Sequence, residues 1–190
     1  MLKETPNLTL RPFEIEDWPI LSHWFYSGNY REFFRDVSTA LTISQFSVYA
    51  NMVNGQCFLA RLKDDNKNDK AGSVVGLVMV YEINWAASIA KIGILIDEKF
   101  QNKRFSMESI WSIGDYLINK MRLRKIVVEC LEENEKLAHI VSVGGFKKEA
   151  TLISECVIDG VEKNVTRYCI FSEEAKTILK EYGDRLWFQQ

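Results

Sequence analysis

The chain has 190 residues, of which 47% are hydrophobic and 26% are charged, and its formal net charge is -2. This is the length of one domain with a substantial core, and the composition is that of ordinary soluble globular proteins. A nearly neutral charge gives no electrostatic reason to expect nucleic acid or an anionic membrane surface as a partner. The composition therefore argues against both of these function classes.

The start of the chain carries no predicted signal peptide, because residues 1–6 lack an apolar core, and no apolar run reaches membrane-spanning length. We therefore expect a cytoplasmic protein. The four cysteines are scattered and have no paired ligand spacing, which predicts buried reduced thiols, no disulfide framework and no metal site. They are Cys57, Cys130, Cys156 and Cys169.

The first third of the chain begins with an alternating strand over residues 8–11, halted by Pro12. Asp17 is the predicted N-cap of the next helix, and residues 30–34 and 44–53 are predicted as short helices. Core packing is the favoured role of the aromatic residues in this region, and lining a substrate pocket is the alternative. These residues are Trp24, Phe25, Tyr26, Tyr30, Phe33 and Phe34.

Two strands follow over residues 56–62 and 73–83, separated by a solvated loop of mixed charge over residues 63–70. Gly76 is a predicted bulge in the second of these strands. A turn at residues 84–87 then leads into a strand that ends at Ile96, which predicts an antiparallel hairpin.

The centre of the chain reads as strand, polar loop, helix and strand over residues 92–96, 97–104, 105–121 and 125–128. Two strands joined by a helix of this length are most simply parallel neighbours in one sheet, connected by a right-handed crossover. The start of the helix leaves main-chain N–H groups without partners at the positive end of the helix dipole. We therefore expect a diphosphate group to bind at the carboxyl end of the first strand.

In the last third, Asn134 is the predicted cap of a helix that ends at Val143, before two glycines. Strands over residues 151–158 and 161–171 flank Asp159-Gly160, a strong hairpin signal. A final helix is predicted from Ser172 to about Tyr182, followed by a short apolar tail at residues 186–188. Residues 1–190 thus form one predicted α/β (α+β) domain of about seven strands, antiparallel at both ends and parallel only around the central helix.

This order of elements, together with the polar turn at residues 101–106, resembles the GNAT superfamily of acetyl-CoA-dependent N-acetyltransferases. The resemblance is closest to the branch that includes the ribosomal-protein N-terminal acetyltransferases. It extends from residues 8–12 to Tyr168, and its main markers are residues 90–94, Ile96-Asp97, Asn134 and residues 145–149.

The resemblance implies acetyl-CoA as co-substrate, with its pyrophosphate held by main-chain N–H groups in a loop of the pattern Gln/Arg-x-x-Gly-x-Gly/Ala. Gln101 matches this pattern, but Arg104 and Ser106 replace the two small residues. We favour retained binding, with Arg104 as an added cation, over the alternative of a solvated charged turn and a lost site. The expected coenzyme-binding residues are Ile94, Leu95, Ile96, Gln101, Asn102, Lys103, Arg104, Phe105, Ser106, Met107 and Asn134.

Two further roles follow from the resemblance. Main-chain N–H groups near residues 94–96 are expected to hold the thioester carbonyl. Asn134 is expected to cap its own helix and, by the resemblance, also to contact the pantetheine arm of the coenzyme.

For catalysis, the resemblance implies a glutamate base at the position of Lys91, and a tyrosine or serine acid near Leu137 or Val141. Lysine is a poor base here, and neither aliphatic residue donates a proton. The candidate catalytic residues are therefore Glu129, near the point where the central strands are expected to separate, and His139, which titrates near neutrality.

Glu82 is a further candidate proton acceptor. For Glu82, Glu129 and His139 the alternative is an ordinary solvated or structural side chain. Positioning a neutral amine beside the thioester would also permit catalysis without a strong acid or base.

We therefore predict an N-acetyltransferase that transfers an acetyl group from acetyl-CoA to a primary amine, whether of a protein N-terminus, an amino sugar, a polyamine or an antibiotic. The alternative is a catalytically degenerate module of the same fold that binds acyl-CoA as a sensor or scaffold. A third possibility is an α/β domain that binds no coenzyme. Monomer and homodimer both remain open.

Overall fold

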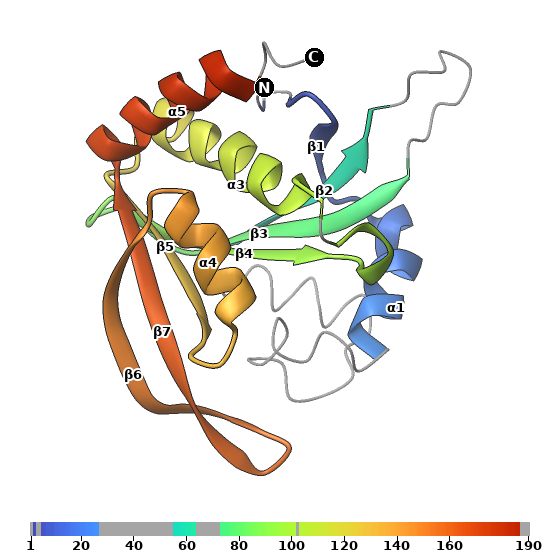
Figure 1. Ribbon diagram of the computed structural model, residues 1–190. Coiled ribbons are helices and arrows are strands. Elements are labelled where there is room, and N and C mark those ends of the chain that lie inside the picture. Colours follow the sequence, from blue (N-terminus) through green and yellow to red (C-terminus); the bar gives the residue numbers. More distant parts are fainter. Residues whose placement is uncertain (1, 3–4, 27–54, 64–72, 102, 187–190) are drawn as a thin grey trace.

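The structure is a computed structural model that describes residues 2, 5–26, 55–63, 73–101 and 103–186. The described strands form one seven-stranded sheet in the order β1-β2-β3-β4-β5-β7-β6 (Figure 1). The strands are β1 (Leu8–Pro12), β2 (Gln56–Leu62), β3 (Val74–Asn84), β4 (Ile89–Ile96), β5 (Lys125–Leu131), β6 (Lys147–Ile158) and β7 (Val161–Phe171). Only β4 and β5 pair in parallel; every other neighbouring pair is antiparallel, as the sequence predicts.

The described helices are α1 (Trp18–Tyr26), α3 (Phe105–Asp115), α4 (Glu135–Val143) and α5 (Ser172–Leu186), with short helical turns η1 (Ile15–Asp17), η2 (Glu98–Phe100) and η3 (Tyr116–Lys120). Side chains of α3, α4 and α5 share one apolar cluster with one face of the sheet, including Ile113, Val141 and Ala175. Leu21 and Trp24 of α1 pack with Leu77 and Leu95 in a second cluster. Because successive strand residues point to opposite faces, the sheet has two differently covered sides (Figure 1).

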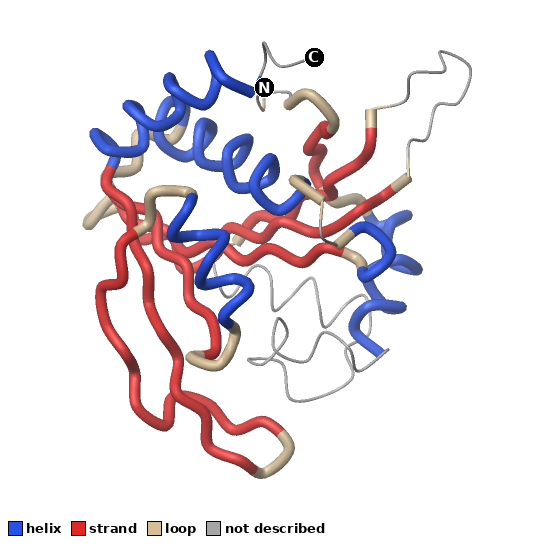
Figure 2. The backbone as a smooth tube through the Cα atoms, in the orientation of Figure 1, coloured by secondary structure: helices blue, strands red, loops and turns tan. Residues whose placement is uncertain are grey.

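Strands β6 and β7 form a long hairpin that reaches beyond the rest of the sheet (Figure 2). Asp159 and Gly160 at its tip have φ values of 52° and 79°. Positive φ at both central residues is typical of the type I′ turn that an Asp-Gly pair favours, so the predicted hairpin is confirmed. Within the described residues, no helix combines the length and apolar character needed to cross a membrane.

Three predicted details are wrong. First, Asp17 is not the N-cap: the helical turn η1 precedes α1, and its N-cap is Glu14. The Asp17 carboxylate instead accepts a hydrogen bond from the Glu14 N–H at 2.9 Å. Asp17 also forms an ion pair with Arg11, and the hydrogen bond from Arg11 lowers the pKa of the Asp17 carboxyl group. The helix predicted to Met121 is regular only to Asp115 and then widens into a π-helical turn. Strand β6 begins at Lys147, four residues earlier than predicted, because it pairs along nearly all of β7.

Several predictions fall on residues that the structure does not describe. They are the helices at residues 30–34 and 44–53, most of the loop at residues 63–70, Asn102, and the tail at residues 187–188. The pocket-lining alternative for Tyr30, Phe33 and Phe34 lies outside the described residues for the same reason. Of the other three aromatic residues, Trp24 is fully buried, Phe25 is half-buried and Tyr26 is exposed.

The first turn of α3 is tied to the segment before β1 by one buried carboxylate. Glu108 is only 4% exposed. It accepts hydrogen bonds from the Thr5 hydroxyl at 2.6 Å, the Asn7 main-chain N–H at 3.0 Å and the Asn7 side-chain amide at 2.7 Å. Since a buried carboxylate is tolerated only when its hydrogen bonds are satisfied, these contacts fix the start of α3 relative to the sheet.

The bulge predicted at Gly76 is present in β3, but it lies at the neighbouring residue Val75. Ala60 lies opposite Gly76 but Arg61 lies opposite Val74, so Val75 is an extra residue in β3. A Cβ atom at Gly76 would lie 2.2 Å from the main-chain oxygen of Leu95 in β4. The close approach of these two central strands therefore requires glycine at this position.

We expect Gly76→Ala to lower the free energy of unfolding by about 2 kcal/mol, since overpacking against main chain forces strands to separate. Gly114→Ala is the matched control, because a Cβ atom at Gly114 in α3 meets nothing within 4 Å. It is expected to raise stability by up to about 1 kcal/mol through helix propensity. Urea unfolding of both variants measures the difference, and a Gly76 variant as stable as the unmodified protein would contradict the packing argument.

Candidate functional site

The parallel strands β4 and β5 pair over only part of their length. Their register runs from Ile89 opposite Lys125 to Ile92 opposite Val128 and stops there. Beyond this point β4 stays paired with β3 as far as Ile96, and β5 stays paired with β7 as far as Leu131. The two strands therefore separate, and the edge of β4 over residues 93–96 has no strand partner in β5. This opening is the V-shaped gap referred to below.

The start of α3 lies just after the open end of β4. Arg104 precedes the helix with φ of -73° and ψ of 5°, and its side chain makes no capping hydrogen bond. The first main-chain bond of the helix runs from the Glu108 N–H to the Arg104 carbonyl at 3.0 Å. The N–H groups of Phe105, Ser106 and Met107 precede that bond and have no intrahelical acceptor. Because φ at Arg104 is negative, glycine is not needed there.

Side chains of the loop before α3 are held by different groups. Gln101 donates from Nε2 to the Ile96 carbonyl at 3.2 Å, and its Oε1 accepts from Lys136 Nζ of α4 at 3.0 Å. Lys103 Nζ lies 5.8 Å from the ring centre of Phe100 and 5.7 Å from that of Phe105. Lys103 thus makes cation–π contacts, whereas Arg104 is exposed at the helix start.

Asn134 is the cap of α4, as predicted, because its side-chain oxygen accepts from the Leu137 N–H at 3.0 Å. Further along this helix Leu137 is half-buried and Val141 is fully buried in the core. His139 is exposed on α4. The predicted catalytic role of His139 and the predicted pantetheine contact of Asn134 stay predictions.

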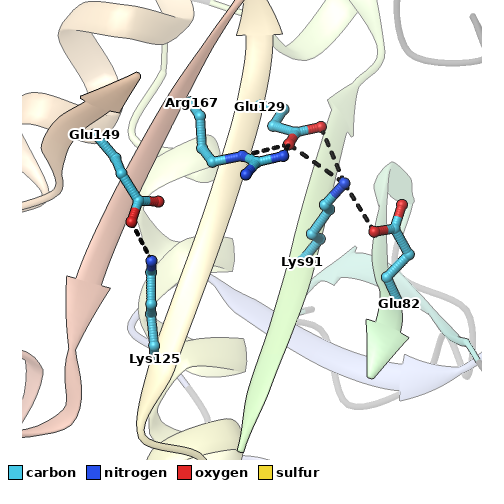
Figure 3. Close-up of polar contacts among 6 residues, drawn as sticks. All are labelled: Glu82, Lys91, Lys125, Glu129, Glu149 and Arg167. Atoms are coloured by element: carbon cyan, nitrogen blue, oxygen red, sulfur yellow. Dashed lines mark hydrogen bonds and ion pairs between the residues drawn. The ribbon is translucent and has the colours of Figure 1, made fainter. Parts of the chain in front are cut away.

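A row of four charged side chains crosses the sheet beside the V-shaped gap (Figure 3). Glu129 of β5 is the most buried, with 5% of its side chain exposed, and lies 2.7 Å from Arg167 of β7 and 3.3 Å from Lys91 of β4. Lys91 is also 2.8 Å from Glu82 of β3. We call Glu82, Lys91, Glu129 and Arg167 the charged row.

The charged row lies on the α1 side of the sheet. Lys91 is opposite Tyr81 in the register of β3 and β4, and Tyr81 packs against the cluster that contains Leu21 and Trp24 of α1. Glu129 is directly opposite Arg167 in β5 and β7. The neighbouring residues Ile92 and Val128 point to the other side, into the cluster shared with α3. The row and the start of α3 therefore approach the gap from opposite faces.

The structure brings Glu129 and Glu82, two of the candidate proton acceptors, to the same cation. The negative charge of Glu129 is compensated by two cations, Lys91 and Arg167. Glu82 lies against Lys91, and its side chain is 55% exposed. Their predicted roles in proton transfer stay predictions. Sequence reasoning missed Arg167, although it lies within the strand predicted over residues 161–171, which the structure pairs with β5.

The four cysteines differ in their burial. All four cysteines are free. Cys130 and Cys169 are buried and Cys57 and Cys156 half-buried, and burial raises the pKa of Cys57 to about 12. Among the described residues, no group of three His, Cys, Asp or Glu side chains is arranged to hold a metal ion.

A family model described as acetyltransferase (GNAT) domain matches residues 7–147. Spermidine N(1)-acetyltransferase of Escherichia coli is 33% identical over 115 residues, which are 60% of this chain and 62% of that protein. The Vibrio cholerae enzyme of the same name is 31% identical over 106 residues, 56% of this chain and 61% of the relative. These alignments span about three-fifths of the length of the curated relatives.

Among solved structures, the crystal structure of spermidine N-acetyltransferase from Vibrio cholerae in complex with CoA and spermine has a TM-score of 0.78 with this chain. It is 24% identical, and the match covers 89% of this chain and 98% of that one. The similarity shows that the two proteins share the fold, including the GNAT-like mixed sheet.

We expect Glu129→Gln to lower the free energy of unfolding by about 2 kcal/mol, because it removes the charge that compensates two poorly exposed cations. Glu133→Gln is the control, since Glu133 pairs with Lys163 but is 62% exposed. Exposed pairs of this kind contribute less than about 1 kcal/mol. Urea unfolding at neutral pH gives both values, and equal losses in the two variants would contradict the buried role of Glu129.

Proposed function

The chain belongs to the GNAT acetyltransferase family, and from this we propose that it is an acetyl-CoA-dependent N-acetyltransferase whose acceptor is a primary amine of a polyamine such as spermidine. The observation that carries this proposal is the V-shaped gap between β4 and β5, bordered by the uncapped start of α3. A gap with unpaired main-chain groups at a helix start suits a long, doubly phosphorylated ligand.

The coenzyme fits the α3 side of the gap. The N–H groups of Phe105, Ser106 and Met107, with the guanidinium of Arg104, provide donors and a positive field for a pyrophosphate. Between β4 and β5, main-chain N–H groups near residues 94–96 are expected to hold the thioester carbonyl. Asn134 at the start of α4 and Gln101 beside Ile96 border the same path. When bound, acetyl-CoA supplies the activated acetyl group.

The acceptor fits the α1 side of the gap, where the charged row lies. A polyamine carries several ammonium groups, and carboxylates are the side chains that bind ammonium most strongly. The half-exposed Glu82 is the accessible carboxylate of the row. The relatives named above act on spermidine by name, which supports a polyamine over a protein N-terminus, an amino sugar or an antibiotic as the acceptor. The finer placement beside ribosomal-protein acetyltransferases remains a prediction.

The chemistry rests mainly on positioning. The reacting amine must be neutral when it attacks the thioester. Leu137 and Val141 carry no proton donor, so in this proposal neither of them protonates the leaving thiolate. Glu129 and His139 remain the predicted residues for proton transfer, and holding the amine beside the thioester accounts for the remaining rate enhancement.

Thiol release from acetyl-CoA, measured with spermidine, spermine, an aminoglycoside and a peptide with a free N-terminus, tests the proposal. We expect turnover with the polyamines and acetylated polyamine by mass spectrometry. Binding of acetyl-CoA without turnover on any amine would instead support the acyl-CoA-binding module. The absence of a thermal shift with acetyl-CoA would overturn the coenzyme site itself.

We expect Arg104→Ala to raise the Kd for CoA about fivefold at low salt, corresponding to about 1 kcal/mol for an exposed charged contact. The effect should shrink at 0.5 M salt because exposed charges are screened. Lys120→Ala removes the same charge from the exposed far end of this helical segment and should leave the Kd unchanged. Isothermal titration calorimetry measures both, and equal weakening in both variants would show that only net charge matters.

A further inference from the structure

The end of β3 departs from regular strand geometry at Glu82. Tyr81 lies opposite Lys91, but the next aligned pair is Asn84 opposite Ile89, so β3 holds one more residue than β4 over this stretch. Glu82 has φ of 47°, in the left-handed region. This conformation costs free energy for a residue with a side chain, and such strain persists only where the surrounding structure imposes it, often at binding sites.

The bulge determines where the Glu82 carboxylate points. In a regular strand, Glu82 would face away from the side on which its neighbour Tyr81 and the opposite residue Lys91 lie. Bulges commonly re-aim a side chain in this way. Here the carboxylate comes to 2.8 Å from Lys91 Nζ (Figure 3). The strained residue thus adds a carboxylate beside Lys91, which is one residue before the last paired position of β4 with β5, Ile92.

Glu82 differs from Glu129 in how it is compensated. Glu129 is 5% exposed and lies against both Arg167 and Lys91, while Glu82 is 55% exposed and lies against Lys91. Lys91 is shared between the two carboxylates. An incoming ammonium group that takes over the Glu82 carboxylate therefore leaves Lys91 paired with Glu129, and no buried charge loses its partner.

We propose that Glu82 binds an ammonium group of the acceptor polyamine, and that this group is not the one that becomes acetylated. The reacting nitrogen must be neutral to attack, whereas the partner of a carboxylate is a cation. Glu82 is thus a specificity-determining residue that distinguishes amines with a second positive charge from simple monoamines. The inference rests on the proposed function, because it names the acceptor contact of the same site.

The first test compares Glu82→Gln with Glu149→Gln. Glu149 of β6 forms the same kind of ion pair with Lys125 of β5, outside the charged row (Figure 3). We expect Glu82→Gln to raise the KM for spermidine about tenfold, with kcat and the KM for acetyl-CoA within about twofold of the unmodified protein. The KM for n-butylamine, a monoamine, should not change, and Glu149→Gln should change neither. Equal effects on the two amines, or in the two variants, would overturn the proposal.

Glu82→Gly separates binding from folding. Glycine accepts a positive φ without strain, so this variant is expected to have a higher Tm and the same loss of spermidine affinity. A glycine variant that binds spermidine normally would overturn the assignment.

Calorimetric titration of spermidine in the presence of CoA applies the same comparison without turnover. If the unmodified protein acetylates no amine, the proposed function fails, while weaker spermidine binding by Glu82→Gln alone would still support the contact. Unchanged binding would overturn it.

Discussion

The structure depends on the point at which two parallel strands stop pairing. Strands β4 and β5 pair as neighbours up to Ile92 and Val128. Beyond these residues, β4 pairs with β3 alone and β5 pairs with β7 alone. Leaving main-chain groups of a central strand unpaired costs free energy unless something else binds them. The proposed function assigns this length of strand edge to a ligand, and the crossover helix α3 begins beside it because the chain must leave β4 at that end.

The charged row exists because the α1 side of the sheet is not uniformly apolar. On the other side, alternate residues of the same strands join an apolar cluster with α3, α4 and α5. Lys91, Glu129 and Arg167 would be costly as single buried charges. They are tolerated because two cations flank the most buried carboxylate at 3.3 and 2.7 Å, and because exposure increases outward along the row to Glu82.

Most of the sheet was predictable because its signals are local. The Asp-Gly turn, the cap at Asn134 and the apolar runs of β3, β4 and β5 each specify their element within a few residues. The start of α3 was predictable for the same reason, since any helix start offers free N–H groups. The bounds of β6 and the π-helical turn were not, because long-range pairing and packing decide them.

The charged row was only partly predictable. Glu82 and Glu129 were identifiable as acidic residues at or near predicted strands, but the pairing of both with Lys91 needs strand register. The bulge that turns Glu82 toward Lys91 depends on one extra residue in β3, which no local pattern marks. Strained positions are where sequence rules are expected to fail, since the surrounding structure overrides local preference there.

The two faces of the sheet have a further consequence under the proposed function, in which the two substrates carry opposite charges. Polyanionic coenzymes and polyamines attract one another in solution, and a shared vestibule would favour their ion pair over a reactive arrangement. Here α3 and the charged row lie on opposite faces, so in the proposed complex the β-sheet would separate the phosphates from the ammonium groups. The two substrates would meet where β4 and β5 part, with the thioester facing the amine and their charged ends apart.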